Sequence, residues 1–511
     1  MQFMTDAPAP AAAKPLFSNS YKALVLGLLL SAYTFNFIDR TIISTIGPKI
    51  REDLHLNNTQ LGALGGLYFA LLYTVLGIPI ARLAERFSRV WIITMALVVW
   101  SGFTALCGTA ANFTTLAAYR FGVGVGEAGC SPPSHSLLSD YFEPKKRATA
   151  LSIYSFGIPL GAMIGAVAGG WLATAFSWRI AFVVVGLPGL LLAILVKLLM
   201  KEPPRGHADL EEKAKLPEDV TAQAAPPPSN GNWAAREVRE MASVAGTLFT
   251  KWPVLNMVLG VTIASFGSYG GGAFGPQYFN SAFHLNLAQV GLIIGLVGGF
   301  SSGVGTLAGG FVSDRLSRRS PRWYALTPAI GLAIATPIYI FAYTQPTWQS
   351  AALVLLVPGI FHYTYLGPTF GVVQNMVETR RRATATALLF FFLNLIALGG
   401  GPLFTGWLID QFAHFNFTQG GGRGVLSSLL GLFGGHGEGA SFTLQCPGGV
   451  APKGAGAGLK LLCQQTLANS TRQGIIVSIF FYAWAAFHYL LGSFGLAQAM
   501  AKARADRGEA D

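Results

Sequence analysis

Long apolar stretches alternate with short polar segments along the whole chain. A helix needs roughly 20 mostly apolar residues to cross about 30 Å of hydrocarbon. Twelve stretches of this kind are predicted as membrane-spanning helices, at about residues 23–47, 60–81, 90–111, 114–138, 148–174, 179–200, 252–276, 287–312, 323–344, 350–376, 383–409 and 473–500. The first stretch is too long for the core of a signal peptide, so we interpret it as an uncleaved span. The pattern predicts an all-α polytopic membrane protein.

The spacing of these stretches predicts two bundles of six helices each. The expected parts are an N-terminal tail, a first bundle, a linker, a second bundle and a C-terminal tail, at residues 1–22, 23–200, 201–251, 252–500 and 501–511. In the linker, apolar positions recur at spacings of three and four, which predicts an amphipathic helix on the membrane surface through Val238, Met241, Ala245 and Leu248.

Composition and charge agree with a membrane protein. Charged residues make up 11% of the 511 residues, against roughly 25% in soluble domains. The net charge of +12 would also suit a nucleic-acid-binding protein. Lys and Arg, however, gather in the short loops on the side of the two tails, and such loops face the cytoplasm. We therefore expect cytoplasmic termini, contact with anionic membrane lipids, no nucleic acid, and a place in the cell membrane, which is the inner membrane in a Gram-negative host.

Cysteine, glycine and proline predict further local features. Residues 410–472 form a Gly-rich outer loop that holds Cys446 and Cys463, on the side of the membrane where disulfides survive. A disulfide between them and two free thiols are the alternatives. Pro132 and Pro133 predict a kink or an end in the fourth span. In the fifth span, glycines at every fourth position favour close helix packing, at Gly157, Gly161, Gly165 and Gly169.

Two charged motifs occur once in each half. The segment ARLAERFSR at residues 81–89 follows the second span, and GFVSDRLSR at residues 310–318 follows the eighth. Likewise, EPKKRATA at 143–150 and ETRRRATA at 378–385 open the fifth and eleventh spans. Internal repeats are typical of secondary transporters. We predict that these charges latch a cytoplasmic gate, although they could also serve topology alone; they are Glu85, Arg86, Arg89, Asp314, Arg315, Arg318, Glu143, Arg147, Glu378 and Arg382.

Four charged residues are predicted within the spans, away from their ends. They are Asp39, Arg40, Arg120 and Glu127. A charge at the bilayer centre costs at least about 2.5–3.5 kcal/mol, so such residues are candidates for function. Arg120 and Glu127 are about 10.5 Å apart along one helix, so each needs a partner from another helix. Our hypothesis pairs Asp39 with Arg120 and Arg40 with Glu127, with the opposite assignment left open. The four residues would couple transport to protons; a static salt bridge is the alternative.

The second half offers uncharged polar and aromatic candidates. A cavity that is charged in one half and aromatic in the other would suit an amphiphile, although plain packing also explains single aromatic residues. The predicted cavity residues are Asn36, Tyr269, His362, Tyr363, Tyr365 and Asn394.

Several segments resemble the Spinster family of the major facilitator superfamily. They are FIDR at 37–40, IPIARLAER at 78–86, RFGVGVGEA at 120–128 and the W-R-x-x-F pattern at 178–182. The resemblance implies lipid-like substrates such as sphingosine phosphate or lysophospholipids, proton coupling, and roles for Asp39, Arg40, Arg120 and Glu127.

Other function classes are alternatives to this one. A proton-coupled transporter of small organic anions or drugs would use the same two arginines. The H-E-x-x-H motif of zinc hydrolases and the G-x-x-x-x-G-K-[ST] loop of ATPases are both absent from the sequence. We therefore expect no enzyme activity, no cofactor and no metal, and a monomer. A channel or a receptor is a further alternative.

Overall fold

The structure, a computed structural model, describes residues 16–205, 207–208, 233–377, 381–419 and 442–505. In this part of the chain every regular element is helical. The first half contains α1 (Asn19–Asp53), α2 (Asn58–Gly65), α3 (Leu67–Arg86), α4 (Arg89–Cys107), α5 (Phe113–Glu127), α6 (Ser131–Tyr141), α7 (Pro144–Ser155), α8 (Gly157–Ala175) and α9 (Trp178–Leu199).

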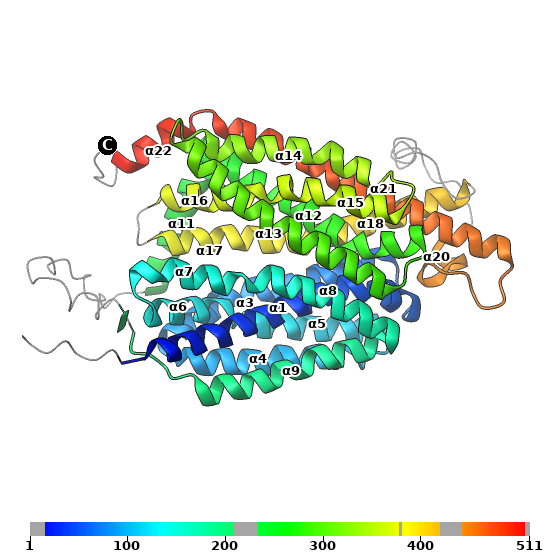
Figure 1. Ribbon diagram of the computed structural model, residues 1–511, viewed down its shortest axis with the longest axis horizontal. Helices are drawn as coiled ribbons and strands as arrows, with labels where there is room; N and C mark the ends of the chain where they lie inside the picture. Colours follow the sequence, from blue (N-terminus) through cyan, green and yellow to red (C-terminus); the bar gives the residue numbers. More distant parts are fainter. Residues whose placement is uncertain (1–15, 206, 209–232, 378–380, 420–441, 506–511) are drawn as a thin grey trace, which may run out of the picture.

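The second half begins with the linker helix α11 (Trp233–Thr250). It continues with α12 (Trp252–Phe283), α13 (Leu287–Ser317), α14 (Trp323–Ala342), α15 (Trp348–His362), η2 (Tyr363–Tyr365), α16 (Leu366–Asn375), α17 (Arg382–Phe392), the π-helix η4 (Leu393–Leu398), α18 (Gly399–Thr418), α20 (Phe442–Gln445), η5 (Pro447–Gly449), α21 (Ala457–Ser493) and α22 (Leu496–Ala505). The two halves form two bundles that lie side by side, the first blue to teal and the second green to red (Figure 1).

The molecule has a tail end and a loop end. The tail end holds Asn19, Leu199 and Ala505, whereas the loop end holds Leu54 and the segment from Phe442 to Ala457. Each bundle has its own apolar core, built in the first half around residues such as Ile42 and Trp100 and in the second around residues such as Phe279 and Tyr489.

Within the described residues, 11 helices are long and apolar enough to cross a membrane. The remaining predicted span, at residues 114–138, corresponds to two helices, α5 and the short α6. The break comes directly before Pro132 and Pro133, which lie in the first turn of α6. Proline lacks a backbone N–H and disrupts a continuous helix, as the sequence predicted. The all-α, two-bundle fold class is confirmed.

The last span differs from its prediction at both ends. Helix α21 begins at Ala457, well inside the segment expected to be loop, and ends at Ser493 instead of residue 500. At Gly495 the backbone adopts φ 78°, in the left-handed region that favours glycine. The chain turns there and continues as α22, whose buried residues Leu496, Met500 and Ala503 lie on one face. Span length alone could not show this turn.

The two outer-loop cysteines adopt one of their two alternative states, and the fifth-span glycines pack closely as predicted. A disulfide joins Cys446 to Cys463, and Cys107 and Cys130 are buried free thiols. The fifth-span glycines face α1 so closely that a Cβ atom on Gly161 would lie 2.3 Å from the Thr34 carbonyl oxygen. Small residues allow this approach of two helix backbones.

The most extensive contacts between the halves join α8 to α13 and α2 to α18. A Cβ atom on Gly170 of α8 would lie 2.1 Å from the Leu287 carbonyl oxygen, and one on Gly62 of α2 would lie 2.1 Å from the Pro402 carbonyl oxygen. The residues Gly170, Leu287 and Gly62 all lie near the loop end. The halves therefore pack backbone to backbone at the loop end.

Candidate functional site: a buried charge cluster between α1 and α5

Two helices of the first half supply the four predicted membrane charges. Helix α1 carries Asp39 and Arg40, and α5 carries Arg120 and Glu127. The Arg40 Nε atom donates to Glu127 Oε2 at 2.8 Å, so the predicted Arg40–Glu127 contact is formed. The Glu127 side chain is fully buried, and the Arg40 side chain is 15% exposed. Within the pair, only the Arg40 side chain is therefore partly accessible.

Aromatic rings surround the Arg40 guanidinium. Its Cζ atom lies 5.1 Å from the ring centroid of Phe37, 4.8 Å from that of Phe69 and 4.6 Å from that of Tyr73. The quadrupole of an aromatic ring attracts a cation, most strongly where water is excluded. These rings therefore help to hold a charged group inside the bundle.

Asp39 and Arg120 do not form the direct pair that we predicted. Asp39 Oδ2 accepts a hydrogen bond from Thr104 Oγ1 at 3.0 Å. Arg120 Nε donates to the Leu64 carbonyl oxygen at 3.3 Å, and its guanidinium lies 5.3 Å from the Phe69 centroid. The helices place the two side chains against different neighbours, and no carboxylate of the described residues lies within the 4 Å ion-pair distance of Arg120.

Several buried polar atoms of this cluster have no hydrogen-bond partner. They are Asp39 Oδ1, Glu127 Oε1, Arg120 Nη1 and both side-chain polar atoms of Asn36. An unsatisfied buried polar group costs about 1–3 kcal/mol, more when it is charged. The cluster thus has spare acceptors for protons and a spare donor for an anion. A static salt bridge would need neither.

The second half brings Tyr269 of α12 near this cluster. Tyr269 is 40% exposed, yet it lies within electrostatic range of Arg40, Tyr73 and Tyr363. Tyr363 is partly buried, and its ring lies 4.7 Å from that of His362. Asn394 lies in the π-helix η4 and is partly buried.

The other two candidates of the second half pack inside their own bundle. His362 is 1% exposed, and its ring lies 4.3 Å from that of Tyr482 and 5.5 Å from that of Tyr365. The Tyr365 hydroxyl is hydrogen-bonded to Ser265 Oγ at 3.1 Å. These contacts place both residues in an aromatic core rather than in the lining of a substrate cavity.

Sequence reasoning missed three residues of the site: Phe69, Tyr73 and Thr104. Phe69 and Tyr73 are four apart on α3, and their rings stack with centroids 5.3 Å apart. Their spacing shows that they share a helix face, but an apolar face is also the mark of ordinary packing. Only the approach of α1 and α5 identifies these residues as neighbours of Arg40 and Arg120.

The predicted gate residues lie at the tail end, and one of them has an unexpected place. Arg89 is 1% exposed and binds Asp140 of α6 and Glu202 of the linker, the latter at 2.6 Å. Asp140 belongs to the same half and Glu202 follows its last helix, α9, so in this structure Arg89 fastens the start of the linker to the first bundle. The latch prediction did not anticipate that role.

The other gate residues differ in their surroundings. Arg86, Arg315 and Arg318 are exposed, and Asp314 accepts a hydrogen bond from Tyr324 at 3.1 Å. Arg147 donates to the Ser139 carbonyl oxygen at 2.7 Å, and Glu143 is partly buried directly before α7. Glu378 and the side chains of Glu85 and Arg382 lie outside the described part of the chain.

Known proteins match the chain in sequence. The profile of the Major Facilitator Superfamily matches residues 29–402. An MFS-type efflux pump of Mycolicibacterium smegmatis is 30% identical over 401 residues, which cover 78% of this chain and 87% of that protein. Protein spinster of Drosophila melanogaster is 26% identical over 412 residues, or 77% of this chain and 63% of that protein.

A solved structure matches the fold over almost its whole length. It is the crystal structure of a bacterial homologue of the human lysosomal transporter Spinster, in an inward-facing and unoccupied conformation. The TM-score is 0.77 at 30% identity, and the match covers 95% of this chain and 99% of that one. The chain therefore belongs to the major facilitator superfamily and, within it, to the Spinster family.

Proposed function

We propose that this protein is a proton-coupled secondary transporter that moves a lipid-like amphiphile by alternating access. The observation that carries the proposal is the Arg40–Glu127 pair, joined at 2.8 Å between α1 and α5. Beside it, Asp39 and Arg120 have buried polar atoms without partners. Coupled transport needs a site that can exchange a proton for another partner, and this cluster has the groups to do so.

The proposed cycle turns on competition for Arg40. An anionic headgroup that reaches the Arg40 guanidinium would compete with the Glu127 carboxylate for the same donor. A buried carboxylate that loses its cationic partner is costly, and taking up a proton removes its charge. Substrate binding and protonation of Glu127 or Asp39 would then depend on each other. Tyr269 and Tyr363 would supply apolar surface for the rest of the amphiphile.

The proposed orientation places the tail end in the cytoplasm. Lys and Arg gather in its short loops, and cytoplasmic loops carry such an excess. The tail-end charges, Asp314, Arg315 and Arg318 among them, would then form the inner gate, and the disulfide of the loop end would face the oxidising side of a cell membrane. Since the halves pack closely at the loop end, the proposed orientation would make the outer end the closed one.

A drug or small organic anion is the second candidate substrate. The relative from Mycolicibacterium smegmatis is an efflux pump by name, and Arg40 and Arg120 would also bind a small carboxylate. Competition separates the two candidates. If the substrate is an amphiphile, lysophospholipids should block uptake at concentrations where dicarboxylates and drugs have no effect.

Reconstitution into liposomes tests the proposal directly. We expect a pH gradient to drive uptake of lysophospholipid or sphingosine phosphate, and we expect Asp39→Asn and Glu127→Gln each to reduce gradient-driven accumulation roughly tenfold or more. Glu52→Gln is the matched control, because Glu52 is a 43% exposed carboxylate paired with Lys49. Full gradient-driven uptake by both charge-cluster variants would contradict proton coupling.

A further inference from the structure

At the loop end, a carboxylate of the second half binds the first turn of a helix in the first half. Asp410 lies near the end of α18, and α2 begins at Asn58. Asp410 Oδ1 accepts from the Asn58 backbone N at 3.0 Å and from Asn58 Nδ2 at 2.8 Å. Asp410 Oδ2 accepts from the Thr59 backbone N at 2.7 Å and from Thr59 Oγ1 at 2.6 Å. One side chain thus makes four hydrogen bonds across the two halves.

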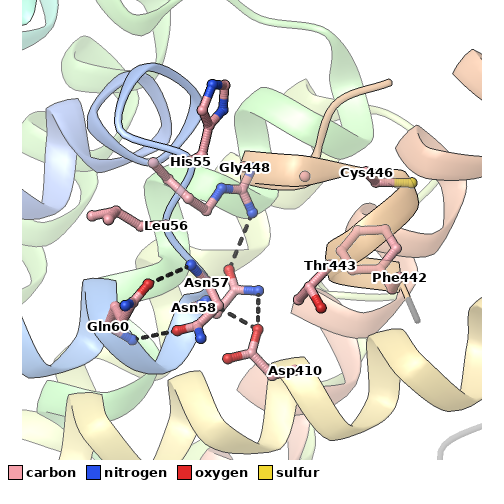
Figure 2. Close-up of a pocket in the computed structure, with 12 residues that line it drawn as sticks. His55, Leu56, Asn57, Asn58, Gln60, Asp410, Phe442, Thr443, Cys446 and Gly448 are labelled. Carbon is pink, nitrogen blue, oxygen red and sulfur yellow. Dashed lines mark hydrogen bonds between the residues drawn. The ribbon is translucent and has the colours of Figure 1, made fainter. Parts of the chain in front are cut away.

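These contacts complete the capping of α2. Asn57 and Gln60 already form a capping box, in which Asn57 accepts from the Gln60 backbone N at 2.7 Å and Gln60 accepts from the Asn57 backbone N at 3.0 Å (Figure 2). The backbone N–H groups of Asn58 and Thr59 are left over, and Asp410 takes both. A carboxylate is favourable at the positive end of a helix. The capping of α2 is therefore complete only while the halves are together.

A second layer of polar contacts lies beside Asp410. Asn58 Oδ1 accepts from Arg51 Nη1 at 3.1 Å and from Gln277 Nε2 at 2.8 Å, and Gln277 Nε2 also lies 2.8 Å from Thr471 Oγ1. Arg51 is 4% exposed and Gln277 is 1% exposed. The network joins α1 and α2 of the first half to α12 and α21 of the second.

The disulfide-bonded segment covers this network. The turn at Pro447–Gly449 follows Cys446, which is tied to Cys463 of α21. Gly448 and Gly449 have φ of 64° and 79°, and a Cβ atom on Gly449 would lie 2.7 Å from the Arg51 guanidinium. Glycine adopts this backbone conformation without strain, and a Cβ atom on Gly448 would lie 2.6 Å from the Arg51 carbonyl oxygen. Together with Asp410 and Asn58, the turn lines a cavity of about 130 Å³ (Figure 2).

We propose that these contacts form the gate at the loop end. Asp410 is its latch, and the segment Phe442–Cys463 is a strap that the Cys446–Cys463 disulfide holds over Arg51. The inference rests on the proposed alternating-access function, because a gate is needed only if the halves separate at this end. Opening would break the four Asp410 contacts at once and lift the turn from Arg51.

Leu61 of α2 provides a reporter for gate opening. It is 7% exposed and packs into the apolar core of the second half, so a cysteine at this position should be shielded from solvent while the gate is shut. The experiment uses Leu61→Cys in purified full-length protein that also carries Cys107→Ala and Cys130→Ala. A charged maleimide is the probe, and its rate of reaction is measured with and without Asp410→Ala.

We expect Asp410→Ala to raise the labelling rate roughly tenfold or more, because hydrogen bonds to a charged group are lost across the interface. Asp410→Asn, which keeps an acceptor oxygen but no charge, should give an intermediate rate. Removing the strap disulfide with Cys446→Ala and Cys463→Ala should also raise the rate. Glu52→Gln, which neutralises a carboxylate at the same end without touching the latch, should leave it unchanged.

Equal labelling rates in Asp410→Ala, Asp410→Asn and Glu52→Gln would overturn the latch, and an unchanged rate without the disulfide would overturn the strap. If Asp410→Ala does not give folded protein, Asp410→Asn decides. The measurement needs neither substrate nor a proton gradient. A failed gate therefore leaves the liposome test of transport untouched, and failed transport leaves the gate measurable.

Discussion

The Arg40–Glu127 pair shows how single residues keep a charge inside the membrane. Glu127 is fully buried and contacts Arg40 at 2.8 Å, and aromatic rings of α1 and α3 surround the guanidinium. The remaining Glu127 oxygen has no hydrogen-bond partner. Such an unsatisfied atom adds nothing to stability. The ion pair itself is also weak evidence for a stabilising role, because replacing a buried ion pair by apolar residues is often neutral or stabilising. The arrangement therefore suits the proposed coupling role better than a purely stabilising one.

Breaking the pair on one side should destabilise the protein. Glu127→Ala leaves the Arg40 cation without its anion, so we expect the free energy of unfolding to fall by about 3 kcal/mol, seen as a lower thermal unfolding temperature in detergent. The double variant Arg40→Met with Glu127→Leu should recover most of that loss while transport stays absent. Asp314→Asn, at an exposed carboxylate, is the control and should change stability by less than about 0.5 kcal/mol. A double variant that still transports would remove the pair from the mechanism.

At the scale of elements, the segment after α9 is fastened to the start of α4. Glu202 accepts hydrogen bonds from Ser88 Oγ at 2.8 Å, from Arg89 Nε at 2.6 Å and from the Val90 backbone N at 3.0 Å. Burial raises the pKa of Glu202, but the hydrogen bonds from Val90, Arg89 and Ser88 outweigh that effect and hold the pKa below its usual 4.5. The first bundle thus depends on an ionised linker residue.

This depressed pKa predicts the sign of a pH effect. A carboxyl group whose pKa is lower in the folded state stabilises the protein above its unfolded pKa, and the stabilisation is lost as pH falls through the folded pKa. At pH 7, Glu202→Gln should lower the free energy of unfolding by about 1–2 kcal/mol. The difference from the native protein should shrink as the pH falls below 4.5. Thermal unfolding between pH 7 and about pH 3 measures this, and a difference that does not depend on pH would contradict the assignment.

At the scale of the whole molecule, the two halves meet where their backbones can touch. Gly170 of α8 and Gly291 of α13 face each other near the loop end, so that a Cβ atom on Gly291 would lie 2.2 Å from the Ala166 carbonyl oxygen. Asp410 and the disulfide-bonded segment close the same end. Closure at this end therefore relies on direct backbone contact at Gly170 and Gly291 in one place. In another place it relies on the proposed charged latch, Asp410.

A single methyl group should weaken that closure. Gly170→Ala would place its Cβ atom 2.1 Å from the Leu287 carbonyl oxygen, so the halves must separate there. Gly102→Ala is the matched control, because nothing lies within 4 Å of the added atom. Spin labels at the exposed loop-end positions Thr109 and Thr344, one in each half, report the separation after Cys107 and Cys130 are replaced. We expect Gly170→Ala, but not Gly102→Ala, to add a population with a longer distance between the two spin labels. Identical distance distributions in both variants would contradict the closed interface.

What the sequence by itself determined follows from local composition. The spans, the two halves, the break before Pro132 and the four membrane charges could all be predicted, because hydrocarbon thickness and the cost of buried charge act on each segment separately. The repeated loops and the Spinster motifs were also visible along the chain. These features settle the fold class and supply the charged residues that form the candidate site.

Only the tertiary structure decided which of those residues are neighbours. It joined Arg40 to Glu127 but left Asp39 with Thr104, surrounded Arg40 with rings from α3, and turned Arg89 towards the linker. It also brought Asp410 to the start of α2, across 352 positions of sequence. Such contacts depend on how each helix is rotated and how closely the halves approach, and both are properties of packing between distant segments.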